Sequence, residues 1–97
     1  MDAAYELRGV TFVWDPAKAE SNKQKHGVAC EEAAEAFFDP FVRVVDTDSE
    51  DESRDGIIGM DTRWNLLFVV HILFEDDTIR MISARTATRH ERRWYED

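Results

Sequence analysis

Arginine side chains crowd the last eighteen residues of this 97-residue chain, RMISARTATRHERRWYED. Residues 80–95 contain five arginines against one acid, a local charge of +4, whereas the whole chain carries −9. The planar guanidinium group is suited to binding phosphate and carboxylate groups. The segment therefore favours an RNA-type substrate or an acidic partner, with a solvated helix face as the ordinary alternative. Its arginines are Arg80, Arg85, Arg89, Arg92 and Arg93.

Arg85 is the best placed of these arginines to bind an anion. It stands where a strand is expected to end and just before a capping box formed by Thr88 and Glu91, which opens a helix to about Glu96. A phosphate at this junction would meet a guanidinium group and free backbone N–H groups together. Arg80 is the second choice, because its odd spacing from Arg85 puts the two on opposite faces of a regular strand unless a bulge shifts the register.

Polar residues also share one face of a helix that is expected near the N-terminus. Asp15 is a capping residue, Pro16 suits the first helical position, and Gly27 is typical of the position after a helix end. Within this helix, the residues at one face are Lys18, Asn22, Lys25 and His26. That face is either an ordinary solvated surface or the edge of a site.

His71 interrupts the most apolar predicted strand, residues 66–74. Regular alternation places it on the same face as Leu67, Val69 and Leu73. Burying an unpaired imidazole costs free energy, so His71 needs a partner or partial exposure. A structural histidine is the first interpretation and a catalytic histidine the second.

An acidic segment, residues 46–55, contains six acids and one base. Like charges at this density repel one another and the segment lacks apolar anchors, so an exposed loop is expected. Arg54 is the one base of this segment, so the acids beside it could compete for that arginine and would repel RNA. The acidic balance of the chain therefore opposes electrostatic attraction of nucleic acid.

Composition and length limit the class of protein. The chain is expected to form one domain over residues 1–97, with 43% hydrophobic residues to build a small core. Neither a signal peptide nor a membrane-spanning segment is evident, which favours a soluble protein of the cytoplasm. The single Cys30 cannot form an internal disulfide, and no Cys/His spacing suggests a metal site or a cofactor.

The order of predicted elements is β-α-α-β-β-β-β-α, an α+β fold with a curved antiparallel sheet packed by helices. The first strand is residues 10–14. The two helices that follow are expected at 16–26 and 30–38, the second with a core-facing stripe of small and aromatic residues. The remaining strands are residues 41–45, 57–60, 66–74 and 78–84, of which the last three must pair as an antiparallel meander because their links are short.

No nucleophile elbow, phosphate-binding loop or two-metal carboxylate set is present. Three segments, however, resemble the BrnT family of toxins from type II toxin–antitoxin pairs. They are WDPAKAESNKQKHG (residues 14–27), EEAAEAFFDP (31–40) and RMISARTATRHERRWYE (80–96). The resemblance extends over residues 12–96 and rests chiefly on the two ends, W-D-x-x-K-x-x-x-N-x-x-K-H-G and I-S-A-R-x-A-T-x-x-E-R-x-x-Y.

The resemblance implies a RelE-like fold and a metal-independent ribonuclease that inhibits growth. It also implies neutralisation by a BrnA-type antitoxin, which alone contacts operator DNA. Such an enzyme uses the RNA 2′-OH as nucleophile, so it needs proton-transfer groups and cations that stabilise the charged phosphorane. The candidates are Lys25, His26 and His71 for proton transfer and Arg54, Arg80 and Arg85 for the phosphate.

Two other functions remain open. One is a non-catalytic interaction module that docks an acidic partner on its basic C-terminal face, which the net charge of −9 favours. The other, a weaker idea, is direct DNA binding by the basic C-terminal helix, for which no recognition module is evident. One departure from the family pattern is Ala29-Cys30, where a capping residue followed by an aromatic residue is more usual.

Overall fold

A computed structural model describes residues 1–47, 50–51 and 53–97, so Asp48, Ser49 and Glu52 of the acidic segment lie outside the described residues. The elements are β1 (Ala3–Leu7), β2 (Val10–Trp14), α1 (Pro16–His26), α2 (Cys30–Ala36), β3 (Arg43–Val45), β4 (Arg54–Met60), β5 (Leu66–Phe74), β6 (Thr78–Thr86) and α3 (Arg89–Glu96). None of the helices in the described chain is long and apolar enough to cross a membrane.

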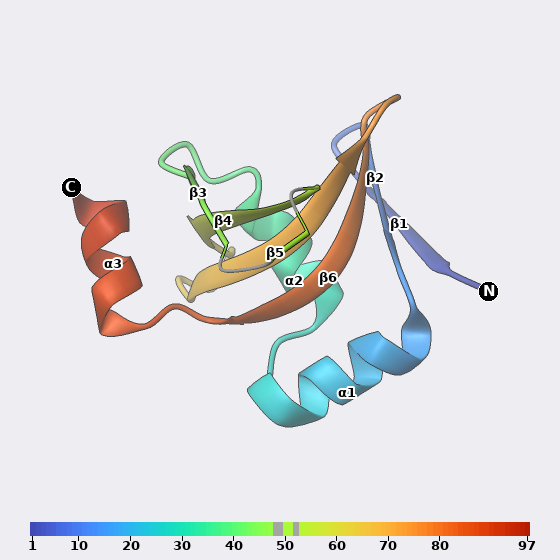
Figure 1. Ribbon diagram of the computed structural model, residues 1–97, viewed down its shortest axis with the longest axis horizontal. Coiled ribbons are helices and arrows are strands. Elements are labelled where there is room, and N and C mark those ends of the chain that lie inside the picture. Colours follow the sequence, from blue (N-terminus) through green and yellow to red (C-terminus); the bar gives the residue numbers. More distant parts are fainter. Residues whose placement is uncertain (48–49, 52) are drawn as a thin grey trace.

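The six strands form one sheet in the order β1-β2-β6-β5-β4-β3. The meander of β4, β5 and β6 is antiparallel as predicted. The prediction of a wholly antiparallel sheet, however, is wrong for one pair of strands, because β2 pairs with β6 in parallel. Parallel pairing needs a long crossover, which residues 15–77 provide. The fold is therefore α+β with a mixed sheet (Figure 1).

Strand β1 was not predicted from the sequence. It forms an antiparallel hairpin with β2 through a two-residue turn, in which Arg8 and Gly9 both have positive φ, at 51° and 84°. Such turns are usually signalled by Asn-Gly or Asp-Gly, and an arginine in the first position hides the signal. The strand itself alternates in burial, with Ala3, Tyr5 and Leu7 half-buried.

Both caps predicted for α1 are confirmed. The Asp15 carboxylate accepts hydrogen bonds from the N–H groups of Ala17 and Lys18, and Gly27 adopts the left-handed conformation with φ 73°. Helix α2 is shorter than predicted. Its last turn tightens, since the N–H groups of Phe37, Phe38 and Asp39 bond to carbonyls three residues back, so the regular helix ends at Ala36.

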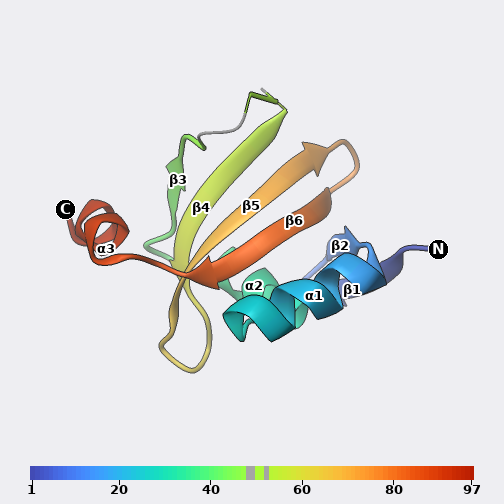
Figure 2. The same cartoon turned by 60° about the horizontal axis from the view of Figure 1, so that its bottom comes forward.

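Helices α1 and α2 lie together on one side of the sheet, and α3 lies at its far end (Figure 2). The main core fills the space between the sheet and α2, where Phe12 is fully buried against the rings of Phe37 and Phe38. A smaller cluster on the other face includes Ile58 and Phe68 and packs against Tyr95 of α3. Helix α3 thus covers one end of that second face.

Candidate functional site

A β-bulge in β6 decides which side chains share a face of the sheet. Val70 of β5 pairs with Ser83, but the next residue of β5, His71, pairs with Met81. Ile82 is therefore an extra residue in β6, and the alternation of faces shifts by one at this point.

The bulge places Arg80 and Arg85 on the same face despite their odd spacing. Arg80 pairs with Ile72 and Arg85 with Phe68, two residues of β5 that point to one face. Arg54 of β4 also pairs with Ile72. The three arginines predicted to stabilise a phosphate thus lie on one face, the face away from α1 and α2.

Three depressions adjoin at the bulge, and Ile82 and Ser83 line all of them. Their volumes are about 350, 60 and 290 Å³. The first lies among β4, β5, β6 and α3, and the other two lie between α1 and β6. The basic side chains that line the first depression are Arg54 and Arg85. Those of the second are Lys18, Arg54 and Arg80. Those of the third are Lys18, Lys25 and His26.

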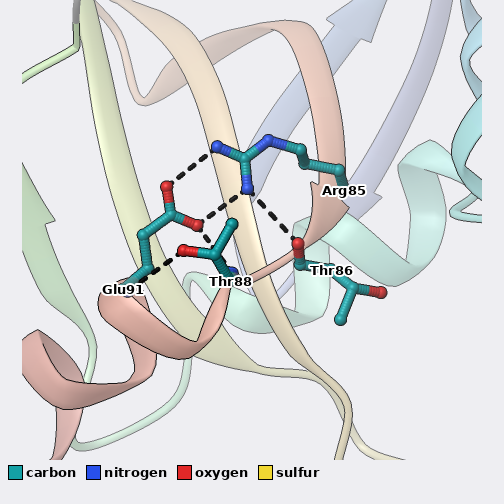
Figure 3. Close-up of polar contacts among 4 residues, drawn as sticks. All are labelled: Arg85, Thr86, Thr88 and Glu91. Carbon is teal, nitrogen blue, oxygen red and sulfur yellow. Dashed lines mark hydrogen bonds and ion pairs between the residues drawn. The ribbon is translucent and has the colours of Figure 1, made fainter.

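The Arg85 guanidinium group is bound to the chain's own carboxylate. Its two terminal nitrogens donate to the two oxygens of Glu91 at 2.7 and 2.8 Å, and one of them also donates to the Thr86 carbonyl at 3.3 Å (Figure 3). The guanidinium carbon lies 4.6 Å from the ring centre of Phe68. Arg85 is therefore held in one orientation by a paired carboxylate and an aromatic face.

The helix start beside Arg85 is occupied by the same carboxylate. Glu91 accepts from the Thr88 N–H at 2.9 Å, and the Thr88 hydroxyl accepts from the Glu91 N–H at 3.2 Å, as the predicted capping box requires. These two N–H groups are therefore not free for a phosphate. The Arg85 guanidinium group, hydrogen-bonded to Glu91, holds the pKa of that carboxyl below its ordinary value.

Replacing Glu91 with glutamine is expected to lower the free energy of unfolding by about 1–3 kcal/mol at neutral pH. This expected loss lies between the contributions of buried ion pairs and of exposed ion pairs. The Glu91 side chain is nearly buried, whereas the Arg85 side chain is 37% exposed. The ionised form stabilises the fold above the ordinary pKa of 4.5, and this contribution is lost as the pH falls through the lowered folded pKa. Denaturant unfolding at pH 3 to 7 measures it.

Glu96→Gln is the matched control, since it removes the same charge from an exposed position of the same helix. The two variants should differ at pH 7 and converge in strong acid. Equal losses at every pH would show that the Arg85–Glu91 pair does not stabilise the fold.

Arg80 and Arg54 also face carboxylates of the chain. Arg80 donates to both oxygens of Asp2, at 2.7 and 3.4 Å. The Arg54 Nε lies 3.8 Å from an oxygen of Asp51, an exposed and loose ion pair. The acidic segment beside Arg54 thus competes for it as expected from the sequence.

Lys25 and His26 are exposed at the end of α1 and lie beside the bulge. His71, by contrast, is 2% exposed and lies on the opposite face, with its ring edge-on to Phe37 at 4.8 Å. Burial lowers the pKa of the His71 imidazole, and its Nδ1 has no partner among the described residues. The structure therefore brings five of the six predicted residues to adjoining depressions and sets His71 apart.

The depressions also contain residues that the sequence did not single out as site residues. Trp94 and Glu91 line the largest, and Asn22 lines the two next to α1. Cys30 reaches the smallest, but burial raises its pKa to about 11, so the thiol is neutral at physiological pH. Among residues 1–47, 50–51 and 53–97, no three His, Cys, Asp or Glu side chains come together as metal ligands would.

Comparison with known proteins identifies the family. Residues 14–91 match the family described as ribonuclease toxin, BrnT, of type II toxin–antitoxin system. No protein of curated function matches the chain significantly. The crystal structure of the Brucella abortus ribonuclease toxin BrnT has a similar fold, with a TM-score of 0.62 and 22% sequence identity over 78% of this chain and 94% of that chain. The family match covers most of the residues, and this chain belongs to the BrnT family of ribonuclease toxins from type II toxin–antitoxin systems.

Proposed function

We propose that this protein is the toxin of a type II pair and cleaves RNA in the cytoplasm without a metal ion, thereby inhibiting translation and growth. The family supports the ribonuclease activity. One observation about the chain itself carries the assignment of the site. The bulge at Ile82 places Arg80 and Arg85 together on the face of the sheet that also carries Arg54, and the depressions that meet there reach Lys25 and His26.

The chemistry requires a proton acceptor, a proton donor and cations. The 2′-oxygen attacks the adjacent phosphorus as its proton leaves, and the bond from phosphorus to the 5′-oxygen breaks as that oxygen gains a proton. The products are a 2′,3′-cyclic phosphate and a 5′-hydroxyl. His26 and Lys25 are the exposed proton-transfer groups at the site, and imidazole can serve in both directions. The arginines stabilise charge on the phosphorane.

Arg54 is the arginine most available to a substrate phosphate. Its pairing with Asp51 is exposed at 3.8 Å, whereas Arg80 and Arg85 each make a hydrogen bond of 2.7 Å to a carboxylate. An exposed ion pair contributes about 0–1 kcal/mol, so a phosphate can replace the Asp51 carboxylate at little cost. Arg85 then acts chiefly by holding α3 beside the depression among β4, β5, β6 and α3.

The partner is proposed to be a BrnA-type antitoxin, through which alone the complex reaches operator DNA. Its docking surface is proposed to be the basic face of α3, where Arg89, Arg92 and Arg93 are exposed. The same chemistry supports a second candidate function, a non-catalytic module that binds an acidic protein segment. All three arginines at the bulge already bind carboxylates of this chain, so the surface suits carboxylate ligands.

Cleavage of a structured RNA by the purified protein, with a chelator present, tests the proposed function. Wild type should cleave at discrete positions, whose 5′-hydroxyl ends are mapped by primer extension, and should arrest growth when induced in a bacterial host. Arg54→Ala is expected to lower kcat/KM about 10-fold or more, because a cation facing the phosphate is lost.

Arg63→Ala is the matched control, since Arg63 is exposed and lines none of the three depressions. It should cleave at the wild-type rate. If wild type does not cleave RNA but binds a BrnA-type antitoxin tightly, the interaction module is favoured instead. Cleavage that the chelator abolishes would contradict metal independence alone.

A further inference from the structure

Helix α1 presents Lys25 and His26 to the bulge, yet little apolar packing holds this helix in place. It contains no buried residue, and of its eleven residues only Ala19 and Asn22 are not exposed. Helices in proteins are normally fixed by an apolar face, and a helix without one needs other contacts. The position of α1 on β6 therefore depends on what Ala19 and Asn22 contact.

Asn22 contacts β6 directly after the bulge. Its Oδ1 accepts a hydrogen bond from the Ala84 N–H at 3.1 Å, and its Nδ2 donates to the Ala84 carbonyl at 2.8 Å. The Asn22 amide thus hydrogen-bonds to both the N–H and the C=O of Ala84, as the backbone of a neighbouring strand would. Strand β2 pairs with β6 only as far as Arg80, so Asn22 takes the place of a strand at this edge.

The same amide also fixes the chain on the other side of His26. Its Nδ2 donates to the Val28 carbonyl at 3.3 Å, two residues after His26. Asn22 itself lies one helical turn before His26. The Asn22 side chain therefore fixes the chain both before and after Lys25 and His26. The residue of β6 that it contacts, Ala84, lies between the bulge at Ile82 and Arg85.

We propose that Asn22 is a positioning residue, which holds Lys25 and His26 at the distance from the β6 bulge that the reaction requires. The catalytic effect of Asn22 rests on the proposed function, whereas its contact with Ala84 does not. Asn22 does not donate or accept the reacting proton. Its amide sets where the neighbouring groups stand, and a misplacement of about 1 Å can lower a rate about 100-fold.

Amide hydrogen exchange tests the contact without reference to activity. Asn22→Ala should lower the exchange protection of the Ala84 N–H about 10-fold or more. Gln24→Ala is the matched control, because Gln24 lies on the same helix and its side chain, among the described residues, bonds only to the exposed Glu20 side chain. It should leave the protection of Ala84 unchanged. Unchanged protection in Asn22→Ala as well would overturn the proposal.

Asn22→Asp provides a second variant should the alanine variant fail to fold. A protonated carboxyl group presents an acceptor and a single O–H donor, which suffices for the two bonds to Ala84, whereas a carboxylate lacks the donor and faces the Ala84 carbonyl. Protection of Ala84 relative to wild type should therefore recover as the pH falls and the carboxyl group protonates. Protection that equals the wild type at every pH would contradict the two-point contact.

A double-mutant cycle with His26→Ala separates positioning from a merely structural role. In the wild-type background, Asn22→Ala is expected to lower kcat about 10- to 100-fold with little change in KM. In the His26→Ala background the same change should lower kcat by a clearly smaller factor, because the positioned group that transfers the proton is absent and only Lys25 remains to be positioned. An equal loss in both backgrounds would overturn the proposal. If wild type does not cleave RNA, the proposed function fails and Ala84 exchange alone decides the contact.

Discussion

Replacement of His26 by alanine is expected to lower kcat for RNA cleavage by about 100- to 10,000-fold, the usual contribution of a positioned proton-transfer group. The stability of the fold should not change. His26 is exposed at the last position of α1, and its side chain makes no hydrogen bond with any described residue. A loss of activity in this variant therefore reports on chemistry. Single-turnover cleavage kinetics and thermal unfolding of the same preparation measure the two quantities.

His71→Leu is the contrasting variant. His71 lies on the other face of the sheet under Phe37, and its Nδ1 is buried without a partner among the described residues. Burial of Nδ1 without a hydrogen bond costs free energy, and an apolar side chain of similar volume removes that cost. The variant should keep the wild-type rate of cleavage and at least the wild-type stability. Loss of cleavage in His71→Leu with retention in His26→Ala would reverse the assignment of the two histidines.

Lys25→Ala completes the comparison, because Lys25 is adjacent to His26 and lines the same depression. If His26 transfers the proton and Lys25 stabilises charge, His26→Ala should lower kcat more than Lys25→Ala does. The single-turnover kinetics used for His26→Ala measure both losses, and a larger loss in Lys25→Ala would exchange the two roles.

The local signals of the chain predicted most of the helices and strands, because they act over a few residues. Asp15 and Gly27 fixed both ends of α1, and Thr88 with Glu91 fixed the start of α3. The parallel pairing of β2 with β6 involves strands separated by more than sixty residues, and no local pattern encodes it. The turn at Arg8 and Gly9 was missed because its first residue is atypical of that turn type.

The candidate site was predictable in its residue types but not in its geometry. The spacing of Arg80 and Arg85 allowed either face, and only the bulge at Ile82 decides that they share one. The role of Glu91 was seen as a helix cap, whereas its bidentate contact with Arg85 depends on how α3 folds back on the sheet. Asn22 stood on the same helical face as Lys25 and His26, but its bond to Ala84 spans 62 positions.

Three of the acids have a structural role in these contacts. Each arginine at the bulge is held by a carboxylate from a different part of the chain, namely Asp2, Asp51 and Glu91. The carboxylates orient the guanidinium groups and reduce their net attraction for phosphate. Substrate affinity should therefore depend less steeply on salt than three unpaired arginines at the bulge would suggest, since each pair releases fewer counterions than a free cation.

Replacement of Gly59 by alanine is expected to lower the free energy of unfolding by about 3 kcal/mol or more, at or beyond the upper end of overpacking costs. A Cβ at this position would lie 2.4 Å from the Ala36 carbonyl oxygen and 3.1 Å from its carbonyl carbon. These are backbone atoms at the end of α2, so no side chain can rotate away and the helix itself must move. The cost falls on the main core, which α2 covers.

Gly56→Ala is the matched control, because Gly56 lies in the same strand but faces the other side of the sheet. Its added Cβ would meet the ends of Val45, Phe68 and Thr47 side chains at 3.1–3.2 Å, and these can shift by a few tenths of an ångström. The expected cost is about 1 kcal/mol. Denaturant unfolding of both variants measures the difference. Equal stabilities would mean that α2 is not fixed against β4, and would contradict the close backbone contact at Gly59.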